Sequence, residues 1–285
     1  MDTQAGCEEQ LYYPNYNKDD DTNETSVTYH DSLHDYVQFQ SHVNADGLEE
    51  SITFTYPGTN RTITLSTQLS EDDLAPIFDG SSWAGTRLWS ASIFGIKYLV
   101  DLYHTQHGEN AVGHEIRGKT LCELGSGLGV PSIIWHLMGG NALVTEHERI
   151  VSQLRKNMEM NFIDTLGTTI QIYPLNWSRA AFQRLLQDQQ PFEKNGFDVI
   201  INCDCIFEPL YGKSWIHLAD VIDESLRINP QCLVITSVER RAQDGIDHFL
   251  EYLLNLDHVM KVESVAVDIQ VDRRLEIYVT KGHCE

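Results

Sequence analysis

An apolar, strand-like segment that runs directly into a glycine-rich loop constrains this chain more than any other feature. Residues 121–129 read Leu-Cys-Glu-Leu-Gly-Ser-Gly-Leu-Gly. Glycine has no Cβ, so it lets the main chain turn sharply and lets a ligand approach closely. A strand followed by such a loop predicts a ligand site at the carboxyl end of the first strand of a doubly wound α/β sheet.

The spacing of these glycines narrows the class of ligand. Gly125, Gly127 and Gly129 form G-x-G-x-G, whereas a dinucleotide fingerprint requires G-x-G-x-x-G so that a helix N-terminus can receive the pyrophosphate. Val130-Pro131 follows at the place of the missing glycine. The loop therefore favours S-adenosylmethionine, which has no phosphate. An ordinary strand-to-helix turn is the alternative.

From residue 119 onward, strand-like and helix-like segments alternate. Apolar strand candidates are residues 120–124, 142–145, 169–173, 197–203, 232–236, 262–267 and 275–280. Segments with helical spacing of apolar residues lie between them, at 131–138, 148–161, 180–187, 213–227 and 247–254. Five strand–helix units predict a parallel sheet. Only residues 268–274 separate the last two strands, so these should pair antiparallel.

The rest of the chain divides into two N-terminal parts. Residues 1–28 are acidic and show no period, so we expect them to be disordered. In residues 29–80, apolar and polar residues alternate at 36–39, 51–56 and 62–65, which predicts a small antiparallel β meander. Residues 81–285 form the main domain and should begin with a helix over residues 89–103.

Charge and composition exclude several classes of function. The net charge of −22 argues against nucleic acid as a partner, and no apolar stretch approaches the roughly 20 residues of a membrane span. Residues 1–80 hold sixteen acidic residues against Lys18 and Arg61, which indicates a solvated acidic tail or a surface that attracts a basic protein. The six cysteines lack zinc-ligand spacing, so we expect no metal. With no signal peptide at residues 1–6, we expect a cytoplasmic protein, with the nucleus as a second compartment.

Two side chains follow strands at positions suited to a nucleoside. Glu146 ends the second strand 21 residues after Gly125, where one carboxylate commonly holds both hydroxyls of a ribose. Its alternative role is an acid at a helix N-terminus. Trp177 follows the third strand and could lie against an adenine ring, or it could belong to the core.

A second informative stretch spans residues 197–211. Its apolar strand delivers Asp204 to a carboxyl end, with Phe207 three residues later. Taken alone, Asp204 suits a helix cap as well as a catalytic group.

At this point the chain resembles the seven-strand protein-lysine methyltransferases (lysine methyltransferase family 16), especially the methyltransferase-like 21 subgroup, whose members modify translation factors and chaperones. The resemblance covers roughly residues 80–255. It rests on Gly85-Thr86-Arg87-Leu88-Trp89, the glycine loop, Asn157-x-x-x-Asn161, Leu175-x-Trp177, Asp204-x-x-Phe207 and Val238-Glu239-Arg240-Arg241. It implies a Rossmann-like, doubly wound, seven-stranded methyltransferase sheet with an antiparallel last strand, here with a small N-terminal β extension.

The resemblance also implies roles for individual residues. Asp204, Phe207 and Glu239 would form the catalytic, target-lysine side. The cofactor, S-adenosylmethionine, would be surrounded by Trp89, Glu123, Gly125, Gly127, Gly129, Glu146, Trp177 and Cys203. We expect a monomeric enzyme that methylates a lysine of a protein with a basic surface. A small-molecule or protein-histidine methyltransferase is one alternative, and a non-catalytic assembly module on the same fold is another.

Overall fold

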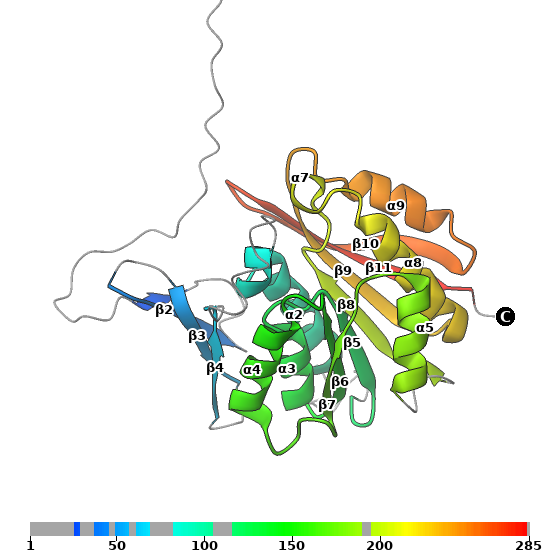
Figure 1. Ribbon diagram of the computed structural model, residues 1–285. Helices are drawn as coiled ribbons and strands as arrows, with labels where there is room; N and C mark the ends of the chain where they lie inside the picture. The colour runs from blue at the N-terminus through cyan, green and yellow to red at the C-terminus, as the bar shows by residue number, and fades with distance from the viewer. Residues whose placement is uncertain are drawn as a thin grey trace, which may run out of the picture.

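A seven-stranded sheet forms the centre of the computed structural model, which describes residues 26–28, 37–45, 49–56, 61–68, 82–104, 116–189 and 195–283 (Figure 1). Its strands are β5 (Thr120–Leu124), β6 (Asn141–Glu146), β7 (Ile170–Pro174), β8 (Val199–Cys203), β9 (Leu233–Arg240), β10 (Val259–Ile269) and β11 (Arg274–Gly282). They lie in the order β10-β11-β9-β8-β5-β6-β7. The predicted seven-stranded α/β fold is confirmed.

The pairing of the strands follows the prediction as well. Strands β5 to β9 run parallel to one another, whereas β11 runs antiparallel to both β9 and β10. The central strands are buried on both faces, because side chains alternate between two hydrophobic clusters. In β8, Val199 and Ile201 belong to one cluster and Ile200 to the other.

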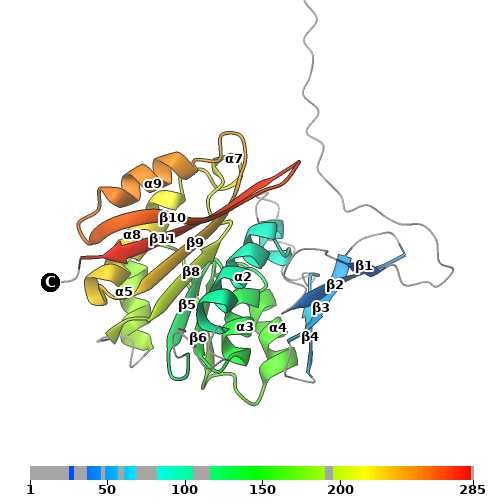
Figure 2. The ribbon, with the colours of Figure 1, turned by 180° about the vertical axis from the view of Figure 1, so that it is seen from behind.

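Helices cover both faces of this sheet (Figures 1 and 2). One face carries α2 (Ser90–His104), α3 (Val130–Leu137) and α4 (Val151–Phe162), and the other carries α5 (Arg179–Asp188), α8 (Trp215–Ile228) and α9 (Ile246–Leu254). Two short elements that the sequence did not predict are η3 (Ser82–Thr86) and α7 (Glu208–Tyr211). Within the described ranges, no helix has the length and apolar character that a membrane crossing needs.

A second, four-stranded antiparallel sheet precedes the main domain. It consists of β1 (Ser26–Thr28), β2 (Gln38–Val43), β3 (Glu49–Thr55) and β4 (Thr62–Ser66), in that order. The predicted meander is present. Its first strand, β1, lies inside the segment 1–28 that we expected to be disordered; these three residues are ordered as a strand because they pair with β2. Residues 1–25 and the acidic residues 71–73 lie outside the described ranges.

The small sheet shares its core with the main domain. Phe39, Ile52, Phe54, Ile63 and Leu65 are each at most 2% exposed and belong to the same hydrophobic cluster as α2, α3 and α4. The sheet therefore buries its apolar face against the helical layer that covers the main sheet.

Side-chain amides on α4 cover the edge of β4. The amide of Asn161 accepts from the N–H of Thr64 at 3.0 Å and donates to its carbonyl at 2.7 Å, and Asn157 makes the same pair of bonds with Ser66 at 2.8 and 3.1 Å. Gln153 adds a bond of 2.6 Å to the Ser66 carbonyl. These amides take the place of a further strand, so the main-chain N–H and C=O groups of Thr64 and Ser66 at the edge of the sheet have hydrogen-bond partners.

Replacement of Asn161 by alanine should therefore weaken the attachment of the small sheet. The main-chain N–H and C=O of Thr64 would lose their partners, which we expect to lower the free energy of unfolding by about 1–3 kcal/mol. Urea unfolding measures this loss. The control Glu159→Ala, on an exposed position of the same helix, should change stability by no more than about 0.5 kcal/mol. Equal effects of the two substitutions would contradict a role for the amide.

Candidate active site

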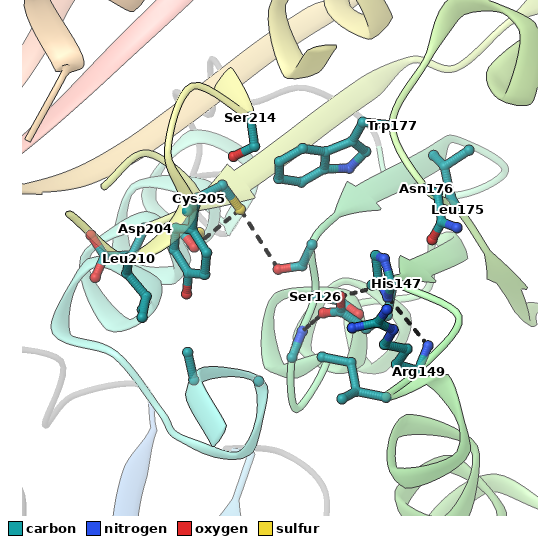
Figure 3. A pocket seen from close by; sticks show the side chains of 18 of the residues that line it. Ser126, His147, Arg149, Leu175, Asn176, Trp177, Asp204, Cys205, Leu210 and Ser214 are labelled. Atoms are coloured by element: carbon teal, nitrogen blue, oxygen red, sulfur yellow. Dashed lines mark hydrogen bonds between the residues drawn. The ribbon is translucent and has the colours of Figure 1, made fainter. Parts of the chain in front are cut away.

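A cavity of about 530 Å³ opens at the carboxyl edge of the main sheet. Its walls come from the loops after β5, β6, β7 and β8, together with η3, α7 and the start of α8. Figure 3 shows Asp204 and Leu210 on one side, Leu175 and Asn176 on the opposite side, and Ser126 between them. The cavity thus lies where parallel α/β sheets bind their ligands.

The glycine loop forms the floor of this cavity in a conformation that requires glycine. Gly125 and Gly127 have φ angles of 66° and 54°, in the left-handed region. A Cβ at Gly125 would lie 2.8 Å from the sulfur of Cys205 and 2.9 Å from Trp177, and a Cβ at Gly127 would lie 3.1 Å from the carbonyl oxygen of Gly85. The bare main chain therefore forms a tight cradle.

Glu146 fixes the shape of the loop. Its carboxylate accepts from the N–H of Gly127 at 2.6 Å and from the N–H of His147 at 2.6 Å. Burial raises the pKa of this carboxyl, and the two N–H donors oppose that rise. Glu146 does not cap α4, whose N-cap is Ile150. Each oxygen keeps a second lone pair, so the carboxylate can still accept from a pair of ligand hydroxyls.

Two further side chains on the cavity wall, those of Trp177 and Ser126, suit contact with a ligand. Trp177 is partly buried, lines the cavity and packs against the cluster beneath α5 and α8, so it contacts the core and also borders the cavity. The hydroxyl of Ser126 is buried on the wall and has no hydrogen-bond partner among the described residues. A buried hydroxyl without a partner is costly, and a ligand in the cavity would satisfy it.

Asp204 stands just past the end of β8, and its side chain is only 3% exposed. Its φ of 55° is unusual for a residue other than glycine, and its N–H donates to the carbonyl of Ser237 at 2.8 Å. The N-cap of α7 is Phe207, so Asp204 is not a helix cap. Instead, its carboxylate forms a bidentate ion pair with Arg241, at 3.0 Å from Nη1 to Oδ1 and 2.7 Å from Nη2 to Oδ2.

The guanidinium of Arg241 lies among the residues predicted for the target-lysine side. Its Cζ is 5.2 Å from the centre of the Phe207 ring and 5.6 Å from that of the Trp89 ring, both within range of a cation–π contact. Its Nη2 is 3.3 Å from a carboxylate oxygen of Glu239. Phe207 and Glu239 do not line the cavity themselves. They flank Arg241 at the end of the cavity where Asp204 lies, which we call the acceptor end.

A family model described as lysine methyltransferase matches residues 69–255 of the chain. The chain belongs to the lysine methyltransferase family. Secreted RxLR effector protein 48 of Plasmopara viticola is 32% identical, over 53% of this chain and 78% of that protein. EEF1A lysine methyltransferase 3 of Mus musculus is 24% identical, over 81% of this chain and 86% of its own length. A SAM-dependent methyltransferase from Agrobacterium tumefaciens aligns with a TM-score of 0.48 and 9% identity, over 91% and 90% of the two chains.

Membership of this family confirms the predicted enzyme class, its activity of protein-lysine methylation, and the cofactor S-adenosylmethionine. The residues present fit that cofactor. Gly125 and Gly127 present bare main chain to the cavity, and Glu146 suits a ribose diol. Trp177 offers a ring, and Ser126 has a hydroxyl without a partner among the described residues. Among the described residues, no group of three or more potential ligands could hold a metal ion.

Six of the eight residues predicted to surround the cofactor line the cavity of this lysine methyltransferase: Trp89, Gly125, Gly127, Glu146, Trp177 and Cys203. Gly129 and Glu123 do not. Gly129 starts α3, and a Cβ there would meet Met158 and Leu154, so the glycine serves helix packing. The carboxylate of Glu123 is buried and accepts from the N–H of Ser132 at 2.9 Å, so it anchors the start of α3.

Several wall residues were missed by sequence reasoning. Gly85, His147, Arg149, Asn176, Tyr211, Ser214 and His217 also line the cavity. His147, Arg149 and Asn176 follow strand ends, so the rule that located Glu146 could have found them. Tyr211 lies on α7, a helix of four residues that no pattern in the sequence indicated.

Replacement of Gly127 by valine should weaken cofactor binding strongly. The left-handed φ at this position is one that valine rarely adopts, which brings strain of about 1–2 kcal/mol, and the side chain would also push the main chain of Gly85 away. We therefore expect the affinity for S-adenosylmethionine to fall at least tenfold. Isothermal titration calorimetry measures the affinity. In the control Gly167→Ala, the φ of 82° brings similar strain, but no atom lies within 4 Å of the added Cβ. Normal affinity in Gly127→Val would show that the cradle is elsewhere.

Glu123 gives this protein a pH-dependent stability. Burial raises the pKa of its carboxyl from 4.5 to about 8 in the folded state. Between these values the folded state binds more protons, so stability falls as the pH rises through this window. Glu123→Gln cannot ionise and can still accept from Ser132.

The two proteins should therefore be nearly equal in stability near pH 5, and the variant should be more stable by on the order of a few kcal/mol near pH 9. Urea unfolding at a series of pH values tests this, with Glu159→Gln as an exposed control. A difference that does not depend on pH would rule out titration of Glu123 as the cause.

Proposed function

We propose that this lysine methyltransferase uses Asp204 to receive and orient the ε-amine of a lysine on a protein substrate. The observation that carries the proposal is the position of the Asp204 carboxylate. It lies on the wall of the cofactor cavity and is paired with the guanidinium of Arg241. That guanidinium in turn lies against Trp89, Phe207 and Glu239. An amine bound at this boundary would face the cavity that fits the cofactor.

The chemistry of the transfer explains why a carboxylate is useful there. S-adenosylmethionine supplies a methyl group bonded to a positively charged sulfur. As the amine forms its new bond, positive charge develops on nitrogen, and Asp204 stabilises that charge more strongly than it stabilises a neutral amine. Its role is therefore positioning and charge stabilisation. A dry cavity and correct alignment supply most of the acceleration.

Aromatic rings near Asp204 suit an alkylammonium product. Phe207 and Trp89 already contact a cation, the guanidinium of Arg241. Contacts of this kind are worth about 0.5–2 kcal/mol, depending on how far water is excluded. Phe207 carries no hydroxyl, so its contribution is limited to the ring face.

The acidic character of the chain supports a partner with a basic surface. The net charge of −22 includes a strong excess of acid in residues 1–80, which would attract such a protein over a distance of about 10 Å. We also propose a monomeric protein of the cytoplasm, with the nucleus as a second compartment. Cys122, Cys203, Cys205 and Cys232 are free and buried, which suits a reducing compartment.

Asp204→Asn should abolish methyl transfer while S-adenosylmethionine affinity stays within about threefold, because the amide cannot stabilise positive charge as a carboxylate does. The assay incubates enzyme, radioactive S-adenosylmethionine and an extract from cells that lack this enzyme, and identifies the labelled protein and residue by mass spectrometry. Asp164→Asn, at an exposed position, serves as the control. Unchanged labelling by Asp204→Asn would remove Asp204 from the mechanism, and label on a residue other than lysine would overturn the proposed function.

A further inference from the structure

The ion pair between Asp204 and Arg241 changes what the acceptor site offers to a lysine. A carboxylate has about four lone-pair positions. Arg241 occupies one on each oxygen, and the N–H of Glu239 occupies a second one on Oδ1 at 3.3 Å. One position remains, on Oδ2. Asp204 can therefore accept one hydrogen bond from an incoming amine while its pair with Arg241 stays intact.

The protonation state of the amine is the problem that this arrangement addresses. A lysine side chain has a pKa near 10.4 and arrives as an ammonium ion, but only the neutral amine has a lone pair with which to attack. An isolated carboxylate next to the lysine would favour the ammonium form and oppose the reaction. A positive charge at the same distance would do the opposite.

We propose that Arg241 is a positioning residue that keeps Asp204 in a charge-neutral pair, so that the target lysine binds as a neutral amine. The arriving ammonium ion therefore loses its proton to solvent as the lysine enters the site, before the transfer, and no residue of the chain has to accept it. This inference rests on the proposed function of Asp204 and assigns a role to a residue for which the sequence predicted none.

The main chain around Arg241 holds the side chain ready for this role. Its N–H donates to the carboxylate of Asp244 at 3.0 Å, and the other oxygen of Asp244 accepts from Ile246 at 2.9 Å, which fixes the turn after β9. The Arg241 side chain is 23% exposed. Desolvation lowers the pKa of the guanidinium, but its bonds to Asp204 outweigh this and the pKa is raised overall, so Arg241 remains charged.

Other titratable groups also lie around the end of the cavity where Asp204 stands. They are the thiols of Cys203 and Cys205 from β8 and the segment after it, the phenol of Tyr211 on α7, the carboxyls of Glu123, Glu146 and Glu239 from β5, β6 and β9, and Asp272 and Arg273 in the β10–β11 turn. Burial raises the pKa of both thiols and of the phenol, so these groups are neutral. Burial raises the pKa of the Glu123 carboxyl to about 8, so this group is largely neutral near pH 7.5. Ionised carboxyls among the others favour a protonated lysine, so the cation of Arg241 acts against them.

A single-turnover experiment tests this role. The enzyme is mixed with radioactive S-adenosylmethionine and with the protein that the assay above labels, and the enzyme is in excess over that protein. Two enzyme concentrations that give the same rate are used. The rate constant is measured from about pH 6.5 to about pH 10, so it reports the pKa of the bound lysine. The proteins compared are the wild type, Arg241→Gln, the charge-conserving Arg241→Lys, and the control Arg227→Gln. Arg227 is half-exposed, pairs with the buried Glu224 and does not line the cavity.

We expect Arg241→Gln to shift the pH profile upward by at least about one unit, so that its rate falls about tenfold near pH 7.5 and recovers to within about threefold of wild type near pH 10. Arg241→Lys should keep the wild-type profile because it keeps the charge. Affinity for S-adenosylmethionine and the thermal midpoint verify that each variant is folded.

Three results would overturn the inference. A rate lowered equally at every pH would show a structural role only. A rate raised near pH 7.5 would show that Arg241 obstructs the site and must leave before lysine binds. An unchanged profile, in a wild type that does label lysine, would show that Arg241 has no influence on the amine; absence of labelling by the wild type would instead count against the proposed function.

Discussion

The hydrogen bond from the N–H of Gly127 to the carboxylate of Glu146 holds the active site of this enzyme together. It joins the loop after β5 to the end of β6 at 2.6 Å, within a buried region where an unpaired carboxylate would be costly. The bond requires Gly127 in the left-handed region, and this brings the loop against Gly85. The floor of the cavity, the orientation of the Glu146 carboxylate and the approach of Gly85 therefore depend on one contact between the loop after β5 and the end of β6.

The N-terminal extension depends on a similar use of polar side chains. Asn157 and Asn161 present their amides to β4 at the spacing of one helical turn, which matches alternate residues of the strand, Ser66 and Thr64. The same helix packs its apolar side against Gly129 through Leu154 and Met158. Helix α4 thus connects the small sheet to the start of α3 and, through it, to the glycine loop.

Much of the fold was predictable because its signals are local. The strand over residues 120–124 was found with its observed bounds, since five consecutive buried residues precede a glycine turn. The ion pair of Asp204 with Arg241 was not predictable: the two residues are 37 positions apart and meet only because β8 and β9 are neighbours. Glu123 was misassigned for a related reason, since its position in the sequence does not reveal that its side chain turns toward Ser132 and away from the cavity.

Stability and chemistry each place a demand on the site around Asp204, and one residue meets both. A lone carboxylate as buried as Asp204 would carry a large desolvation penalty, and it would also hold a lysine in its unreactive charged form. A bidentate arginine answers both demands, because it pairs both oxygens and brings a permanent positive charge. Lysine at position 241 would meet the second demand but not the geometry of the first, and a neutral residue would meet neither. The structure of the site is therefore better described by the Asp204–Arg241 pair than by Asp204 alone.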